Sequence, residues 1–116
     1  MLAQRRIEGV VISADPMFNN RRIQLATLGA RYTIPAVAPL REFAEAGALM
    51  SYGPSNLERY RMVGVYTGRV LKGERPAEMP VQQPTAFQLV INIQTARALG
   101  LTVPPTLLAR ADEVIE

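Results

Sequence analysis

Polar and aromatic side chains follow several short apolar runs of this sequence, and they are the residues best suited to bind a ligand. Asp15 follows the apolar run at 9–13, and Tyr52 and Ser55 come at the end of another. A zwitterionic amino acid needs an acid for its ammonium group and free helix N–H groups for its carboxylate. Phe18 and Tyr52 would supply an apolar wall. The predicted ligand-binding residues are Ser13, Asp15, Phe18, Arg41, Glu42, Ser51, Tyr52, Gly53 and Ser55.

Structural roles are an alternative for the same residues. Asp15 precedes a proline, a pair that often forms turns, so Asp15 is either a ligand contact or a turn residue. Ser55 caps a helix in either case, and Gly53 would sharpen the turn before it. Glu42 and Glu45 lie near a predicted helix start, where acids interact favourably with the helix dipole, which argues against a catalytic carboxylate pair.

The composition excludes several classes of chemistry. No cysteine and no histidine is present, which rules out disulfides, thiolate nucleophiles, Cys/His zinc sites and a Ser-His-Asp triad. The GxGxxG, Walker and GxSxG motifs are also missing. We therefore expect a protein that is not an enzyme and that uses no metal or cofactor. The net charge of +3 comes from scattered basic residues, so no nucleic-acid partner is expected.

Short apolar runs predict buried strands, and they alternate with helical patterns along the chain. This alternation indicates an α/β fold, a Rossmann-like and mostly parallel open sheet with helices on its faces. In such a sheet, ligands bind beyond the carboxyl ends of the strands, where the candidate residues lie. The predicted strands lie near residues 9–13, 35–38, 48–52 and 87–92.

Apolar spacing and capping residues predict the helices. Asn19 or Asn20 would cap a first helix that runs to about Tyr32. A longer helix would start at Ser55 in a capping box and end at Gly73. Short helices are expected at 41–45, 95–99 and 106–111. The residues predicted to face the core are Ile23, Ala26 and Ala30 in the first helix, and Leu57, Tyr60, Val63, Thr67, Val70 and Leu71 in the longer one.

Four segments are specific enough to suggest a family: VISADP, LMSYGPS, LKGERPAEMPVQQPT and LVINIQTARALGLTVPP. With them the chain resembles the ABC transporter substrate-binding protein family related to tryptophan-binding lipoproteins, over essentially its whole length. The resemblance implies a type I periplasmic-binding fold, in which two Rossmann-like lobes close on a small solute. It places Asp15 in the cleft of the second lobe and the segment 51–55 near the interlobe crossing. It also implies an amino-acid-like or other small organic solute, an ABC permease as partner and a periplasmic location.

The resemblance matches only the C-terminal third or so of a full-length member, so we expect a single truncated segment. Strand and helix units would occupy residues 1–73, a proline-rich connection 74–85, and a final strand with short helices 86–116. The N-terminal sequence has no recognisable signal peptide, and the chain as written would stay cytoplasmic.

The expected function is that of a solute-binding component of an ABC-type importer. The alternative is a transport-inactive α/β remnant that self-associates. A segment without its first lobe would expose strand edges and apolar faces around 10–12 and 87–91, which favours a homo-oligomer. A two-fold dimer is expected, with residues 74–85 as a hinge for exchange between copies.

Overall fold

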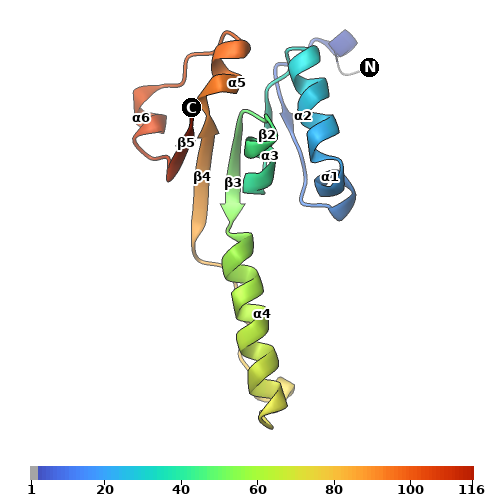
Figure 1. The fold of residues 1–116 in the computed structure, drawn as a ribbon, viewed down its shortest axis with the longest axis vertical. Helices are drawn as coiled ribbons and strands as arrows, with labels where there is room; N and C mark the ends of the chain where they lie inside the picture. The colour runs from blue at the N-terminus through green and yellow to red at the C-terminus, as the bar shows by residue number, and fades with distance from the viewer. Residues whose placement is uncertain (1–2) are drawn as a thin grey trace.

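The computed structural model describes residues 3–116, and its centre is a five-stranded sheet in the order β1-β2-β3-β4-β5 (Figure 1). Strands β1 to β3 are parallel, β4 runs antiparallel to β3, and β5 is parallel to β4. The predicted α/β class and mostly parallel sheet are confirmed. The strands are β1 (Val10–Val11), β2 (Ala36–Ala38), β3 (Met50–Pro54), β4 (Phe87–Asn92) and β5 (Glu113–Ile115).

Four strands lie close to their predicted positions, whereas β5 has no counterpart in the sequence patterns. Its three residues, EVI, are one glutamate and two apolar residues, an apolar run too short to indicate a strand. The neighbouring strand fixes it instead: Leu89 N–H donates to the Asp112 carboxylate over 2.7 Å, and Asp112 N–H donates to Leu89 O over 2.9 Å. Pairing with β4 therefore defines this strand, and local sequence does not.

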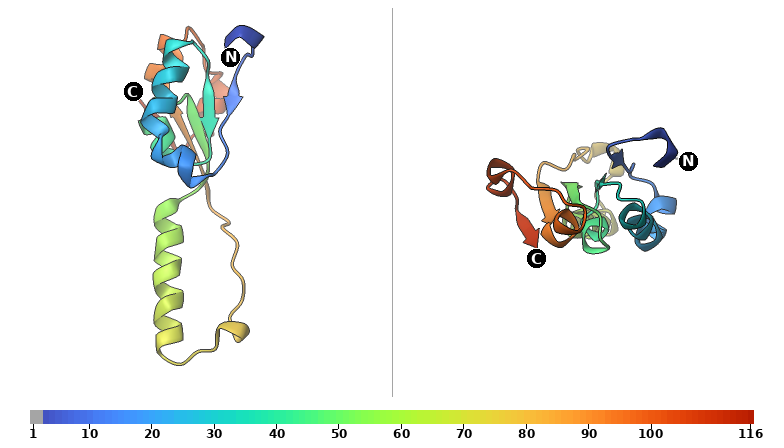
Figure 2. Two further views of the ribbon diagram at one scale, coloured as in Figure 1. Left: turned by 90° about the vertical axis from the view of Figure 1, so that its right-hand side faces the viewer. Right: turned by 90° about the horizontal axis from the view of Figure 1, so that it is seen from above.

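Helices cover one face of the sheet (Figure 2). On this face α2 (Arg22–Arg31), α3 (Arg41–Glu45) and α5 (Ile93–Ala98) lie against the strands, and α6 (Pro105–Leu108) lies beside β5 at the sheet edge. The core beneath the helices is formed by small residues and one large aromatic ring. Its buried cluster is Ala36, Ala38, Phe43 and Ala48, with Val10, Ile12, Phe18, Leu25 and Leu40 packed against it.

A buried asparagine joins two of these helices. Asn92 is only 5% exposed; its Nδ2 donates to Ala44 O at the end of α3 over 2.8 Å, while its Oδ1 accepts from Thr95 N–H and caps α5. Both polar atoms of the side chain are thus satisfied, which removes the cost of burying it.

The opposite face of the sheet carries apolar side chains and no helix from the described part of the chain. Val11 is 82% exposed and Tyr52 59% exposed, and the strand register places Val37, Met50 and Leu89 on the same side. The expectation of helices on both faces is wrong for residues 3–116. We refer to this surface as the open face (Val11, Val37, Met50, Tyr52, Phe87 and Leu89).

The first predicted helix is two helices. Asp15 caps α1 (Pro16–Asn20), and the chain breaks at Arg21 before α2 begins, so Asn19 and Asn20 lie inside or at the end of α1 rather than at a cap. The break changes which side chains face the sheet. Within α2, Ala26 is buried, but Ile23 is 66% exposed and Ala30 is also exposed.

The longest helix, α4 (Asn56–Leu71), projects from the sheet together with the chain that returns from it (Figures 1 and 2). We call residues 55–86 the arm. The returning chain contains the short 3₁₀ helix η2 (Pro76–Glu78) and is tied to α4 where Tyr66 Oη donates to Pro80 O over 2.7 Å. The arm makes the molecule elongated, with extents of 55 × 33 × 19 Å.

No residue of α4 is buried, so the prediction that its apolar stripe faces a core is wrong for the described chain. Tyr60 is 75% exposed and Val63 is 62% exposed, whereas Tyr66 is half-buried against the returning chain. Periodicity indicates that a helix has an apolar face, but it does not say whether a partner surface is present.

Candidate functional site

A cavity of about 120 Å³ lies at the carboxyl ends of β2 and β3, where α3 and α4 begin. This is the end of the sheet at which open α/β folds bind ligands. Five of the predicted ligand-binding residues come together here, namely Arg41, Glu42, Ser51, Gly53 and Ser55. The remaining lining residues are Pro39, Pro54, Asn56, Leu57 and Gln88.

Gly53 lines the cavity at a position where a side chain would not fit. A Cβ atom at this position would lie 2.1 Å from Pro39 O, far inside contact distance. Gly53 also pairs with Gln88 of β4, and this pairing brings Gln88 to the cavity. The glycine before Pro54 is therefore required by packing of the chain after β2 against β3.

Two serines supply hydroxyl groups. Ser51 is 1% exposed and lines the cavity. Ser55 is the N-cap of α4, as predicted: its Oγ accepts from Glu58 N–H over 3.4 Å. The N–H groups of Asn56 and Leu57, in the first turn of α4, have no partner in the described chain.

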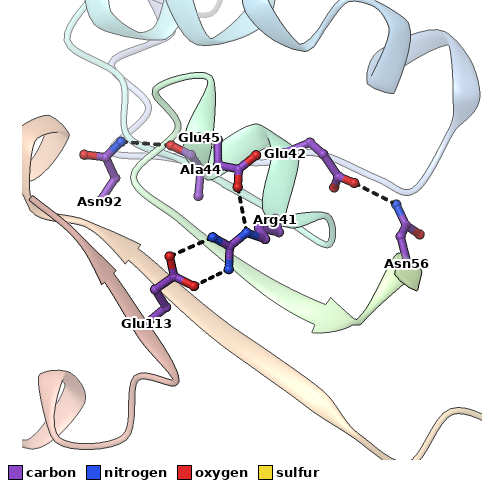
Figure 3. Close-up of polar contacts among 7 residues, drawn as sticks. All are labelled: Arg41, Glu42, Ala44, Glu45, Asn56, Asn92 and Glu113. Atoms are coloured by element: carbon purple, nitrogen blue, oxygen red, sulfur yellow. Dashed lines mark hydrogen bonds and ion pairs between the residues drawn. The ribbon is translucent and has the colours of Figure 1, made fainter. Parts of the chain in front are cut away.

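Glu42 connects the start of α3 to the start of α4. Asn56 Nδ2 donates to Glu42 Oε1 over 3.2 Å (Figure 3). Asn56 Oδ1 in turn accepts from Arg59 Nη1 over 3.3 Å. The side chain of Glu42 therefore points toward α4, and one of its oxygens is already held in place.

Arg41 points the other way, toward β5 (Figure 3). Its Nε donates to Glu45 Oε1 over 2.6 Å, and its two terminal nitrogens make a bidentate pair with Glu113. The hydrogen bonds to Glu113 and Glu45 raise the pKa of Arg41, and those from Arg41 lower the pKa of the Glu113 carboxyl. The charge of Arg41 is thus matched within the protein, so Arg41 is poorly placed to bind an anionic ligand.

The other predicted residues do not line this cavity. The Asp15 carboxylate accepts from Met17 N–H over 2.7 Å and caps α1, so Asp15 has the structural role that was the alternative to ligand contact. Ser13, two residues earlier, is exposed. Phe18 packs against the core. Tyr52 lies on the open face and stacks on Phe87, with ring centroids 5.6 Å apart. Contact of these four residues with a ligand stays a prediction.

Sequence reasoning missed Asn56 and Gln88. Asn56 follows the Ser55 cap directly, so the same helix start that identified Ser55 also indicates Asn56. Gln88 reaches the cavity only through antiparallel pairing of β4 with β3, which no local pattern reveals.

Residues 3–116 lack two further kinds of feature. Within that range no group of three or more His, Cys, Asp or Glu side chains could hold a metal ion. Nor does the same range contain a helix long and apolar enough to span a membrane.

The family model described as ABC transporter substrate binding protein matches residues 3–115. The chain belongs to this family. No curated protein matches this family member. Among solved structures, a conserved domain protein from Vibrio cholerae is 24% identical with a TM-score of 0.91, and the alignment covers 97% of this chain and 38% of that one.

Two further structures resemble this substrate-binding family member. An ABC domain from Streptococcus pneumonia in complex with L-Trp is 24% identical, with a TM-score of 0.89, over 98% of this chain and 40% of that one. A ligand-free, open substrate-binding protein with adhesive properties from Clostridium difficile is 20% identical, with a TM-score of 0.63, over 98% and 40%. At these identities the likeness concerns the fold, and the chain spans about two fifths of each relative.

Proposed function

We propose that this chain is a solute-binding segment of an ABC-type importer and that its cavity receives the polar end of an amino-acid-like solute. The observation that carries the proposal is the convergence of Glu42, Ser51 and the first turn of α4 on one cavity at the carboxyl ends of the strands. Family membership and the L-Trp complex of a structural relative support it. The complete protein would work outside the cytoplasm and deliver its solute to a permease, with no chemical step.

A titration of the ¹⁵N-labelled chain with amino acids, beginning with L-tryptophan, tests this proposal. The amide signals of Ser51, Asn56 and Leu57 should shift in a saturable way. Ser51→Ala removes one hydrogen bond, so it should weaken binding about fivefold. The control, Thr102→Ala, removes an exposed hydroxyl outside the cavity lining and should leave the affinity unchanged. Shifts spread over the whole surface, or equal effects of the two substitutions, would contradict solute binding at this cavity.

A second candidate function is self-association, and the open face favours it. Phe87 is 47% exposed, and Val11 is 82% exposed, on a surface where parallel sheets are normally covered. Not all of the segments predicted to be exposed, 10–12 and 87–91, are available for an interface. Ile91 is fully buried, and Val10 and Ile12 are partly buried against the core. We propose a second copy of the chain as the occupant of the open face, in a two-fold dimer.

Light scattering on the purified chain tests the dimer. Val11→Lys places a charge on the open face and should shift the mass toward the monomer at micromolar concentration. Ile23→Lys is the matched control, because Ile23 is 66% exposed on the helical side of the sheet, and it should leave the mass unchanged. A wild-type monomer at these concentrations would exclude the dimer.

A further inference from the structure

Helix α4 has an inner side that faces the returning chain of the arm and an outer side that faces away from it (Figure 2). On the inner side Tyr66 donates to Pro80 O, and Met62 and Val70 line the groove between the helix and the returning chain. Residues of α4 that do not line this groove recur three and four positions apart, so they share one side of the helix. We call this side the outer face (Leu57, Tyr60, Arg61, Gly64, Val65 and Gly68).

The outer face is apolar over most of its length, and its large side chains are exposed. Leu57 is 77% exposed, Tyr60 is 75% exposed and Val65 is 47% exposed. A contiguous apolar patch on a soluble protein commonly marks a contact with another chain. Nothing in residues 3–116 covers this one.

The shape of the outer face fits a second copy of the same helix. A Cβ atom at Gly64 or Gly68 would meet nothing within 4 Å, so the middle of the face is a depression that another helix can approach closely. In an antiparallel pair centred at Gly64, Tyr60 of each copy lies opposite Gly68 of the other, where its ring has room. The same register places Leu57 opposite Leu71, which is 82% exposed.

Charge favours the antiparallel orientation. Glu58 lies in the first turn of α4, and Lys72 is its C-cap. The antiparallel register sets Glu58 opposite Val70, two residues from Lys72 of the other copy, at both ends of the pair. Both charges are available, because Glu58 has only a 3.9 Å contact with exposed Arg61 and Lys72 has no ion pair within residues 3–116. A parallel pair would instead place the two Lys72 residues at the same end.

We propose that the outer face binds the outer face of a second copy, as an antiparallel two-fold helix pair. This contact goes beyond solute binding and is separate from the open face, because α4 continues the helical side of the sheet (Figure 2). One helix from each copy buries less than the roughly 800 Å² per partner of a stable complex. The pair therefore forms at about 100 µM and above, whereas the open-face dimer is expected at micromolar concentration.

Disulfide cross-linking of single-cysteine variants tests the helix pair. The protein has no cysteine, so a disulfide in such a variant joins two copies. Gly64→Cys lies at the centre of the proposed contact, and its Cβ has open space in the single chain. The matched control is Val81→Cys, which is 94% exposed on the returning chain of the same arm. Every variant also carries Val11→Lys, which opposes contact through the open face. Electrophoresis without reductant measures the rate of covalent dimer formation.

Gly64→Cys should form covalent dimers at least tenfold faster than Val81→Cys, because a disulfide needs Cα atoms within about 7 Å. Adding Glu58→Lys or Lys72→Glu to Gly64→Cys should slow the reaction about threefold, since like charges then meet at both ends. The combination of both charge changes should restore the rate, although it keeps any cost that each change has for the helix itself. Equal rates at positions 64 and 81 would overturn self-association through the outer face. A slowed reaction that the combined variant does not restore would overturn the antiparallel pair.

Discussion

Gly53 is the position where the sheet, the cavity and the arm meet. It stands at the end of β3, next to the cavity, and one residue before the chain turns into α4 through Pro54 and Ser55. Its lack of a side chain lets Pro39 O approach closely. The glycine at position 53 thus allows Pro39, just after β2, to pack closely against β3.

Gly53→Ala should destabilise the protein, because the added Cβ would meet Pro39 O at 2.1 Å and the backbone must move. Overpacking of this kind costs about 1–3 kcal/mol of the free energy of unfolding, measured by urea denaturation. The control is Gly64→Ala in α4, where a Cβ meets nothing within 4 Å. That substitution should not destabilise, since alanine favours a helix by roughly 0.5–1 kcal/mol. If Gly53→Ala left the free energy of unfolding unchanged, packing against Pro39 O would not require a glycine at this position.

At the scale of elements, Arg41 joins α3 to β5. Its bidentate pair with Glu113 links the first turn of α3 to the edge strand β5, which also pairs with β4. Both side chains are partly exposed, at 40% and 45%, so solvent weakens the interaction. The geometry is nevertheless bidentate, which is the arrangement in which an exposed pair contributes most.

The ion pair between Arg41 and Glu113 should make the stability of the protein depend on pH. Arg41 lowers the folded-state pKa of Glu113 below its ordinary value of 4.5, so the carboxylate stabilises the fold at pH above that value. This stabilisation is lost as the pH falls through the lowered pKa, because the folded protein must then bind a proton. Wild type and Glu113→Gln should therefore differ in the free energy of unfolding at pH 7, and the difference should disappear once the pH falls below the lowered pKa of Glu113.

Glu78→Gln is the control for this experiment. Glu78 also faces an arginine, Arg75, but at 3.7 Å and with both side chains largely exposed, at 80% and 68%. Its substitution should change stability little at any pH. A difference between wild type and Glu113→Gln that stays the same from pH 7 down to the most acidic pH at which the protein is folded would show that Glu113 acts through packing rather than charge.

At the scale of the whole molecule, the arm and the sheet differ in how they are stabilised. The sheet has a buried cluster around Phe43, whereas α4 has no buried residue and holds its shape through Tyr66 and the pair of Arg69 with Glu74. Isolated helices shorter than about 12–15 residues are marginal in water, and α4, with 16 residues, is only slightly longer than that limit.

Hydrogen exchange should therefore be much faster in residues 56–71 than in 87–92, because local opening of the arm breaks few buried contacts. Mass spectrometry of the exchanging chain, at two protein concentrations, measures this. Protection of 56–71 that rises with concentration would place the arm in the contact between copies. Equal protection of both segments at high dilution would contradict the view that the arm lacks a stabilising surface.

Much of this fold is determined locally. The apolar runs place β1 to β4, and Ser55 places the start of α4. Five of the residues predicted at or after the strand ends line the cavity. These features are predictable because strand length, helix capping and the position of a ligand at strand ends each depend on a few neighbouring residues.

Only the tertiary structure decided how those residues are used. It paired Arg41 with Glu113 and directed Glu42 toward Asn56, although the two residues are neighbours in the first turn of α3. It separated Asp15 and Tyr52 from the cavity, brought in Gln88 through antiparallel pairing, and added β5. The physical reason is that these outcomes depend on contacts between residues far apart in the chain, whose geometry follows from sheet register rather than from local periodicity.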